Sequence, residues 1–202
     1  VALDNSGRTL ARVKGVFYAL TEADTNDEMS ALSEKIAPVL SEHNDNIYLN
    51  QDLYKRVAAV WQQEQEGKIT LTTEQHRLLD RYYKAFIRSG AGLDAGKQNR
   101  LREINKELST LAITFSNHVL NENNAYRLVI DNEAELAGLP EWVKTGAAEE
   151  AKAVGKEGKW LFTLQNSSRL PLLQYADNRE LRKDIYEAYI NRGNNGDAND
   201  NK

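Results

Sequence analysis

Three histidines, His43, His76 and His118, are the side chains of this chain best suited to bind a metal ion or to transfer protons. A zinc-binding helix typically carries His-Glu-x-x-His, in which two imidazoles lie one turn apart and the glutamate acts as base. No such string occurs here; the nearest pattern is His76-Arg-Leu-Leu-Asp80. Because two ligands without a third rarely hold zinc, we interpret His76 as a solvated residue and expect Asp80 to pair with a nearby arginine.

Other chemically suggestive residues have simpler structural interpretations. His118 takes a heptad position that is usually apolar, and we expect a half-buried, hydrogen-bonded imidazole. Ser167 and Ser168 follow a predicted strand but lack the Gly-x-Ser-x-Gly elbow of a nucleophile, so a turn or helix cap is expected. Gly90 and Gly92 lack the strand-loop-helix context of a phosphate site and indicate a helix C-cap.

The charged and polar clusters also assign no chemistry. The charges between Arg179 and Glu187 are typical of a solvated helix face, and the Asn/Asp-rich run from Gly193 lacks the spacing of a calcium loop. The chain has no cysteine, which excludes a disulfide, a thiolate zinc site and a cysteine nucleophile. The residue patterns therefore assign no catalytic and no metal-binding residue, and leave the substrate-binding residues unknown.

Composition restricts the class of protein and its partners. A length of 202 residues predicts one domain with a sizeable core, or else two small domains. The 26 basic and 30 acidic residues give a net charge of -4 with no basic stripe, so we expect no nucleic-acid partner. No apolar run is long enough for a membrane span. We expect a cytoplasmic protein, or a periplasmic one if an N-terminal signal has been cut away.

Five segments show the apolar periodicity of helices, and we expect an antiparallel helical array. The first begins after a candidate cap at Ser6, the second at a capping box, Thr25-x-x-Glu28, and the third at Asn50. The apolar stripes of the first, second, third, fourth and fifth segments are Leu10, Val13, Phe17 and Leu20; Met29, Leu32, Ile36 and Leu40; Leu53, Val57, Val60 and Trp61; Leu78, Leu79, Tyr82, Tyr83, Phe86 and Ile87; and Leu101, Ile104, Leu108, Leu111 and Phe115.

Punctuating residues refine these helices. Pro38 predicts a kink or a restart within the second, and Gly67 ends the third. A second capping box, Thr72-x-x-Gln75, opens the fourth, and Asp94 begins the fifth, which is the longest. The near-heptad stripe of this last helix predicts that it lies nearly parallel or antiparallel to its neighbours.

Two segments alternate with period two and predict strands, at about 126–131 and 160–164. The long link between them favours a helical crossover and hence a parallel pair. The predicted fold class is therefore mainly α, an antiparallel helical array with one small two-stranded β element.

Both ends of the chain interrupt a pattern, which predicts a piece of a longer protein. Val1 is not an initiator methionine, and a well-capped helix from Asp177 to Arg192 leads into the polar run that ends at Lys202. Tyr186 and Ile190 extend the apolar surface of this helix beyond one stripe. We therefore expect residues after Gly193 to be poorly anchored and the chain to self-associate near this helix. Burial of both side chains, together with an ordered tail, would instead favour a free-standing domain.

An ordered set of motifs covers essentially the whole chain. The longest are F-I-R-S-G-A-G-L (86–93) and R-L-R-E-I-N-K-E-L-S-T-L-A-I-T-F-S-N-H-V-L (100–120). The others are T-N-D-E (25–28), I-A-P (36–38), I-Y-L-N (47–50), E-L-A-G-L-P (135–140), K-W-L-F-T-L (159–164) and R-E-L-R-K-x-I-Y-E-A (179–188). Together they resemble the N-terminal region of bacterial peptidyl-dipeptidases (dipeptidyl carboxypeptidases), zinc metallopeptidases of the thimet oligopeptidase/neurolysin family.

The resemblance implies a hydrolase that removes C-terminal dipeptides from short peptides, with zinc held by a His-Glu-x-x-His helix and a downstream glutamate. That helix lies C-terminal of the matched region, so no catalytic or metal residue is carried onto this chain, which should be inactive alone. Residues 1–192 would form a helical wall that restricts a substrate channel, and 193–202 a loop to the catalytic region. The implied partners are that region and short peptides. The alternative is a free-standing helical protein-interaction domain.

Overall fold

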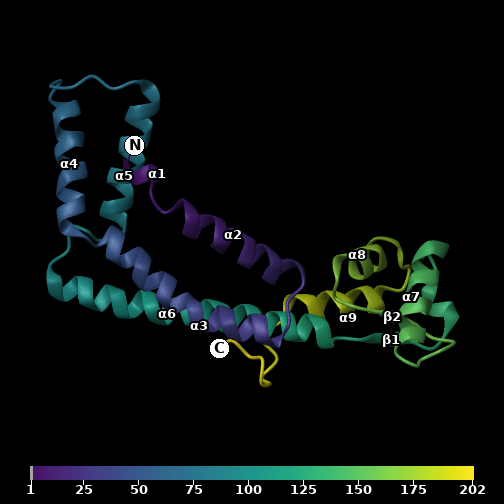
Figure 1. The fold of residues 1–202 in the computed structure, drawn as a ribbon. Helices are drawn as coiled ribbons and strands as arrows, with labels where there is room; N and C mark the ends of the chain where they lie inside the picture. The colour runs from purple at the N-terminus through teal and green to yellow at the C-terminus, as the bar shows by residue number, and fades with distance from the viewer. Residues whose placement is uncertain (1) are drawn as a thin grey trace. The chain divides into compact units, whose positions relative to one another are not determined.

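The structure, a computed structural model, describes residues 2–202, and helices dominate it (Figure 1). The first six helices are α1 (Ala2–Asn5), α2 (Arg8–Ala23), α3 (Asp27–Tyr48), α4 (Gln51–Gln65), α5 (Thr73–Arg88) and α6 (Ala95–Ala125). The remaining elements are β1 (Leu128–Ile130), the 3-10 helix η1 (Glu133–Leu136), α7 (Glu141–Ala153), β2 (Trp160–Phe162), α8 (Asn166–Tyr175) and α9 (Arg179–Ile190). The predicted fold class, mainly α with one small two-stranded element, is confirmed.

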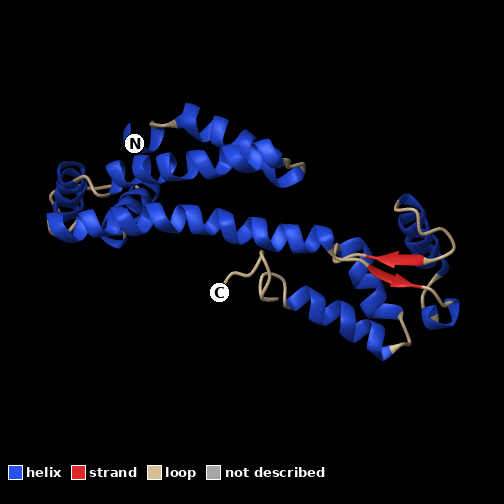
Figure 2. Cartoon of the chain, turned by 90° about the horizontal axis from the view of Figure 1, so that it is seen from below, coloured by secondary structure: helices blue, strands red, loops and turns tan. Residues whose placement is uncertain are grey.

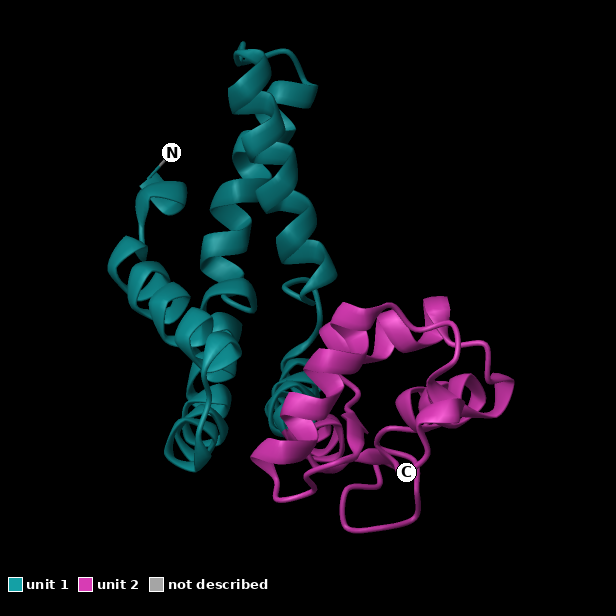
Figure 3. Cartoon of the chain, turned by 90° about the vertical axis from the view of Figure 1, so that its right-hand side faces the viewer, with its two compact units in different colours: residues 1–113 teal, residues 114–202 magenta. Residues whose placement is uncertain are grey.

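The chain divides into two compact units, coloured separately in Figure 3. Unit 1 extends through Ile113 and contains α1 to α5 with the first part of α6. Unit 2 begins at Thr114 and contains the end of α6, the two strands and α7 to α9. The boundary thus falls inside the longest helix.

In unit 1, α4 and α5 form a helical hairpin, and aromatic rings link its two arms. The ring centroids of Trp61 and Tyr83 are 4.4 Å apart in a stacked geometry, and Tyr54 stacks on Tyr83 at 6.3 Å. Phe86, which is fully buried, contacts Tyr54 and Tyr48. Aromatic pairs at these separations contribute beyond their buried area, so this ladder fixes the pairing of the two helices.

Three predicted helix boundaries of unit 1 are confirmed by their hydrogen bonds. Asn50 Oδ1 accepts from the backbone N–H of Leu53 at 2.9 Å, and the Thr72/Gln75 capping box has both of its bonds. Gly67, at φ 69°, follows the last turn of α4. A left-handed backbone at this point costs glycine no steric energy, which suits it to end a helix.

Two predicted caps are wrong by one residue. Asn26, rather than Thr25, caps α3 and accepts from the N–H of Met29 at 2.9 Å, because an asparagine at this site caps as well as threonine. Gly7, at φ 72°, precedes α2, while the Ser6 hydroxyl donates to the carbonyl of Leu3. The serine therefore closes the end of α1 instead of opening α2.

Pro38 lies inside α3, which continues through it, so the predicted restart is wrong. Proline removes one backbone donor, and α3 is 22 residues long. The loss of one hydrogen bond in so long a helix does not divide it.

In unit 2, β1 and β2 pair antiparallel, with Ile130 opposite Trp160, so the predicted parallel orientation is wrong (Figure 2). The chain leaves β1, passes through η1 and α7, and re-enters the sheet directly opposite the residue at which it left. In a pair of three-residue strands, the parallel and antiparallel orientations differ only in the end at which the second strand begins, and these ends are roughly 10 Å apart. A long link can reach either end, so its length does not predict the orientation.

The sheet and α7 to α9 enclose one hydrophobic core. Its fully buried members include Phe162, Leu136, Leu172 and Ile185, and the edges are closed by partly buried Tyr126 and Trp160. Short strands without a partner sheet gain their stability from such packing against helices. The core therefore explains why two three-residue strands form at all.

Candidate functional site

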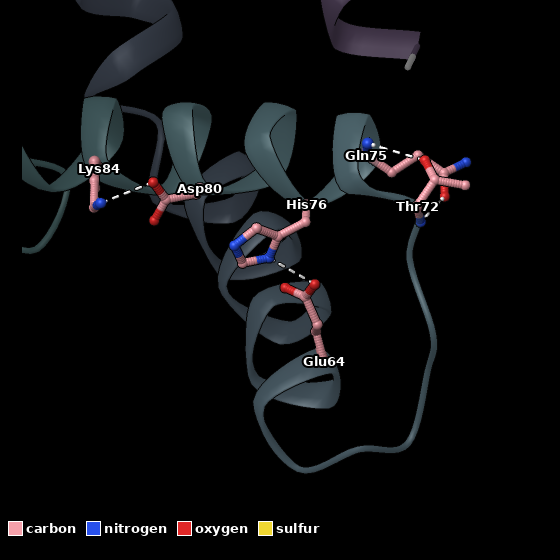
Figure 4. Close-up of polar contacts among 6 residues, drawn as sticks. All are labelled: Glu64, Thr72, Gln75, His76, Asp80 and Lys84. Carbon is pink, nitrogen blue, oxygen red and sulfur yellow. Dashed lines mark hydrogen bonds and ion pairs between the residues drawn. The ribbon is translucent and has the colours of Figure 1, made fainter.

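His76, the first residue of the potential metal pattern, is engaged by a carboxylate from the neighbouring helix (Figure 4). Its Nδ1–H donates to Oε1 of Glu64 on α4 at 2.8 Å. The imidazole is half exposed, as expected for a solvated histidine. The bond joins α4 to the first turn of α5, and its role is to hold the hairpin near its loop.

Asp80, the second residue of that pattern, pairs with a lysine and not with the expected arginine. Lys84 Nζ lies 2.7 Å from Asp80 Oδ2, one turn further along α5 (Figure 4). Residues four apart face each other on a helix, whereas the adjacent Arg81 points elsewhere and lies 3.8 Å from Asp4. His76 and Asp80 are thus committed to different partners.

No group of three His, Cys, Asp or Glu side chains in residues 2–202 is arranged to hold a metal ion. His43 is exposed on α3, and His118 is distant in sequence on α6. A zinc site requires at least three protein ligands, and these residues do not supply such a set.

His118 is half-buried and hydrogen-bonded, as predicted, but its partner is in the C-terminal tail. Its Nδ1–H donates to Oδ1 of Asn201 at 2.9 Å, while Nδ2 of Asn201 donates to the carbonyl of Phe115 at 3.5 Å. The backbone N–H of Asn201 also donates to the carbonyl of Gly193 at 2.8 Å. These bonds close residues 193–201 into a loop against α6.

Glu122, which the sequence patterns did not single out, anchors the other end of this loop. Its side chain is 9% exposed, and Oε2 accepts from the backbone N–H of Gly193 at 2.7 Å and from Asn195 Nδ2 at 2.8 Å. The expectation of a poorly anchored tail is therefore wrong. The physical reason is that Glu122 and His118 lie four apart on α6 and present one polar face.

A second unpredicted cluster stacks two guanidinium groups against one tyrosine. Arg169 and Arg192 lie 3.5 Å and 3.9 Å from the ring centroid of Tyr189. Arg169 is buried and donates to the carbonyl of Leu164 and to Asn166. The negative faces of an aromatic ring stabilise cations, so this stack joins α8 to the C-terminal end of α9.

The remaining sequence candidates have the structural roles expected of them. Ser168 Oγ accepts from the N–H of Thr163 at 3.0 Å at the start of α8. Gly90, at φ 92°, follows α5, and a Cβ there would approach Leu101 to 2.8 Å. Lys183 lies 4.0 Å from Glu180 on an exposed face of α9.

The resolved pKa shifts also have structural causes. The Lys97 backbone N–H lowers the pKa of Asp94 at the start of α6, and the Lys202 N–H lowers that of Asp200. Burial raises the pKa of Tyr126, and the charge of Asp184 adds to the effect. These shifts accompany helix capping, loop closure and core packing, so they do not indicate an acid-base pair.

Apolar rows remain exposed on several helices. In unit 1 they lie mainly on α2 and α6. Leu10, Val13, Val16 and Leu20 form the row on α2, and Leu108 and Leu111 belong to the predicted stripe of α6. Tyr186 and Ile190 of α9 are also exposed, at 52% and 54%. A free-standing domain was expected to bury these two side chains and to have an ordered tail. The tail is ordered, but the side chains are not buried.

Comparison with known proteins gives the relationships of the chain. No family model matches it. Dipeptidyl carboxypeptidase of Escherichia coli (strain K12) is 37% identical over 202 residues, which is 100% of this chain and 29% of that protein. Oligopeptidase A of Salmonella typhimurium is 33% identical over 193 residues, 96% of this chain and 28% of the relative. Saccharolysin of Saccharomyces cerevisiae is 26% identical over 175 residues, which is 86% of this chain and 24% of that protein.

These relatives carry the names of peptidases, and the chain spans less than a third of their length. The similarity to dipeptidyl carboxypeptidase extends over every residue of the chain, and so includes all the motifs from which the resemblance was drawn. The predicted resemblance to the thimet oligopeptidase family is thus confirmed, and this chain is a relative, over its whole length, of dipeptidyl carboxypeptidase and oligopeptidase A.

Proposed function

We propose that this chain is one part of a longer peptidase that removes dipeptides from the C-termini of short peptides. The observation that carries the proposal is the 37% identity with dipeptidyl carboxypeptidase along all 202 residues. For the whole protein we retain two compartments, the cytoplasm and the periplasm. The helices of residues 2–202 do not combine the length and apolar character that a membrane crossing needs.

The role we propose for this part is non-catalytic. Since residues 2–202 contain no three-ligand group, the zinc ligands and the water-activating base would belong to other residues of the same polypeptide. A zinc ion there would supply the activated water for peptide hydrolysis. The helices described here would position the peptide, and they would take no part in proton transfer.

Within the whole enzyme, residues 1–192 would form one wall of the substrate channel and 193–202 the loop toward the catalytic region. The exposed apolar rows of α2 and α6 support this role, because apolar surface of this extent is usually covered by another part of a protein. A channel wall selects peptides by steric exclusion of folded chains, and it aligns the scissile bond by restricting the peptide's orientation.

A photoreactive peptide inhibitor tests the wall directly. The full-length enzyme is irradiated with the bound peptide, and the crosslinked residues are identified by mass spectrometry. Crosslinks within 1–192 are expected. If the enzyme is active and every crosslink lies outside 1–192, the wall assignment is wrong.

Assays on the isolated 202-residue chain test the division of labour. We expect no release of dipeptides above background and no one-to-one zinc in a metal analysis. The full-length protein should release C-terminal dipeptides and lose that activity with a chelator. Stoichiometric zinc in the isolated chain would refute the non-catalytic role.

The alternative is a free-standing helical interaction domain. The bonds that hold the tail to His118 and Glu122 favour this alternative, whereas the exposure of Tyr186 and Ile190 on α9 counts against it. The two functions differ in one observation, which is whether the reading frame continues past Lys202 into a His-Glu-x-x-His helix.

A further inference from the structure

A polar hollow of about 520 Å³ lies within unit 1, between the ends of α3 and α5 and the first half of α6. Its lining residues are Ser41, Asn44, Asp45, Arg88, Ser89, Leu101, Asn105, Leu108 and Ser109. The volume is within the range of sites for small molecules, which typically span 300–1,000 Å³. Its wall offers one carboxylate, one guanidinium, hydroxyls, amides and two leucines.

Asp45 supplies the negative charge of the hollow. The residue is 5% exposed, and its Oδ1 accepts from Asn105 Nδ2 at 2.8 Å. It lies in the last turn of α3, where the helix dipole already adds negative potential. In the part of the chain that the structure describes, no lysine, arginine or histidine comes within ion-pair distance of it. A buried carboxylate in this position favours a cation from outside.

Arg88 supplies the positive charge. It lies at the end of α5 and is exposed, and no carboxylate among the described residues pairs with it. Its guanidinium offers donors in a fork that matches a carboxylate. Asp45 and Arg88 thus line the same hollow with opposite charges, and neither is in an ion pair among the described residues.

We propose that this hollow binds a small zwitterion, a free α-amino acid or a dipeptide. The ammonium group of the ligand binds Asp45, and its carboxylate binds Arg88. The hydroxyls of Ser41, Ser89 and Ser109 accept or donate the remaining hydrogen bonds. Leu101 and Leu108 contact an aliphatic side chain of the ligand.

Both charges of the ligand are required by the pairing. A ligand with an ammonium alone would satisfy Asp45 and leave Arg88 in water. A ligand with a carboxylate alone would bring a second negative charge toward a buried one, which costs free energy. Binding involves no hydrolysis, so it is independent of the proposed peptidase function, and its failure would leave that function untouched.

Isothermal calorimetry on the 202-residue chain tests the site with leucine and the dipeptide Ala-Leu. Leucine should bind with a Kd on the order of 1 mM, a common strength for so few atoms. N-acetyl-leucine lacks the ammonium and leucinamide lacks the carboxylate, and each should bind at least about tenfold more weakly. Whether leucine or Ala-Leu binds more tightly decides between the amino acid and the dipeptide.

Two variants connect binding to the named residues. Asp45→Asn keeps the shape and the bond from Asn105, and should weaken leucine binding at least about tenfold. Arg88→Gln changes an exposed residue, so it should have little effect on stability. It should weaken the binding of leucine about tenfold. The already weak binding of leucinamide should stay unchanged, because that ligand has no carboxylate to pair with Arg88.

The exposed ion-pair residues Asp52 and Arg100 provide matched controls. Asp52→Asn and Arg100→Gln remove the same charges away from the hollow and should leave binding unchanged. The proposal is overturned if neither leucine nor Ala-Leu binds saturably up to roughly ten times the expected Kd. It is also overturned if Asp45→Asn and Arg88→Gln, folded by circular dichroism, bind leucine as the unchanged chain does.

Discussion

The two units differ in where their apolar side chains lie. Of 17 buried apolar residues among positions 2–202, 13 are in unit 2 and four, Ala37, Leu49, Phe86 and Ala91, are in unit 1. Unit 1 is nevertheless the longer, since it extends to Ile113. Unit 2 therefore encloses a core of its own, whereas unit 1 relies on an aromatic ladder and leaves apolar rows open.

This difference indicates that the units have different sources of stability. Burial of apolar area is the main favourable term in folding, so unit 2 should be stable by itself. Unit 1 should gain stability when its open rows on α2 and α6 are covered. The proposed channel wall is consistent with such cover from the rest of the polypeptide.

The largest expected effect compares a core residue with an exposed one. Phe162→Ala removes a side chain that is 1% exposed in unit 2, and should destabilise that unit by about 3–5 kcal/mol. Val13→Ala removes a side chain that is 63% exposed in unit 1, and should cost less than about 0.5 kcal/mol. Hydrogen exchange monitored by mass spectrometry reports each unit separately. Equal losses of protection in both units after Phe162→Ala would show that they fold as one.

The tail loop is the next feature to break. Gly193→Ala should destabilise unit 2 by about 2 kcal/mol, because the backbone is left-handed and the new Cβ would overlap Nδ2 of Asn201. Gly196→Ala is the matched control, since it shares the left-handed backbone but has open space around its Cβ. Gly196→Ala should lower the free energy of unfolding by about half as much as Gly193→Ala does. Urea unfolding measures both, and equal costs would contradict a loop held by Asn201.

Unit 2 also contains the stack of Arg169 and Arg192 on Tyr189, an interaction that stabilises it in addition to its apolar core. Tyr189→Leu should cost about 1–2 kcal/mol by removing the ring between Arg169 and Arg192. Tyr189→Phe keeps the ring and should cost much less. The difference between the two variants in urea unfolding isolates the stack; similar losses would instead assign the effect to the hydroxyl.

Helix capping in unit 1 should have a smaller effect. Asn26→Ala should destabilise unit 1 by about 1 kcal/mol because it removes the acceptor for the Met29 N–H. Thr25→Ala is the control and should cost clearly less, since its hydroxyl makes only a 3.4 Å contact with Ser30. Thermal unfolding followed by circular dichroism compares the pair, and the reverse order would restore Thr25 as the cap.

The smallest effect is a pH dependence confined to unit 2. Burial raises the pKa of Tyr126 above its ordinary value of 10.0, so the folded state holds the phenolic proton more tightly than the unfolded state. That contribution is fully present below pH 10 and is lost as the pH rises through the folded-state pKa. Tyr126→Phe should reduce the loss of stability at alkaline pH, measured by the urea midpoint. An unchanged alkaline loss would assign it to other groups.

The sequence determined the local features of this protein. Asn50, the Thr72/Gln75 pair and Gly67 act through bonds and backbone angles within a few residues, so their positions could be predicted from residue type alone. The family relationship could also be predicted, because ordered motifs do not depend on how the helices pack. The absence of a metal-ligand string followed from the same local reasoning.

Tertiary structure decided which distant residues meet. The antiparallel pairing of Ile130 with Trp160, and the partners of Glu122 and His118 in the tail, join residues 30 to more than 80 positions apart in the chain. The periodicity of a helix shows which residues share a face, but it does not show what covers that face. The open row on α2 and the opposed charges of Asp45 and Arg88 emerge only when the helices are placed in three dimensions, because burial and charge pairing are properties of the packed chain.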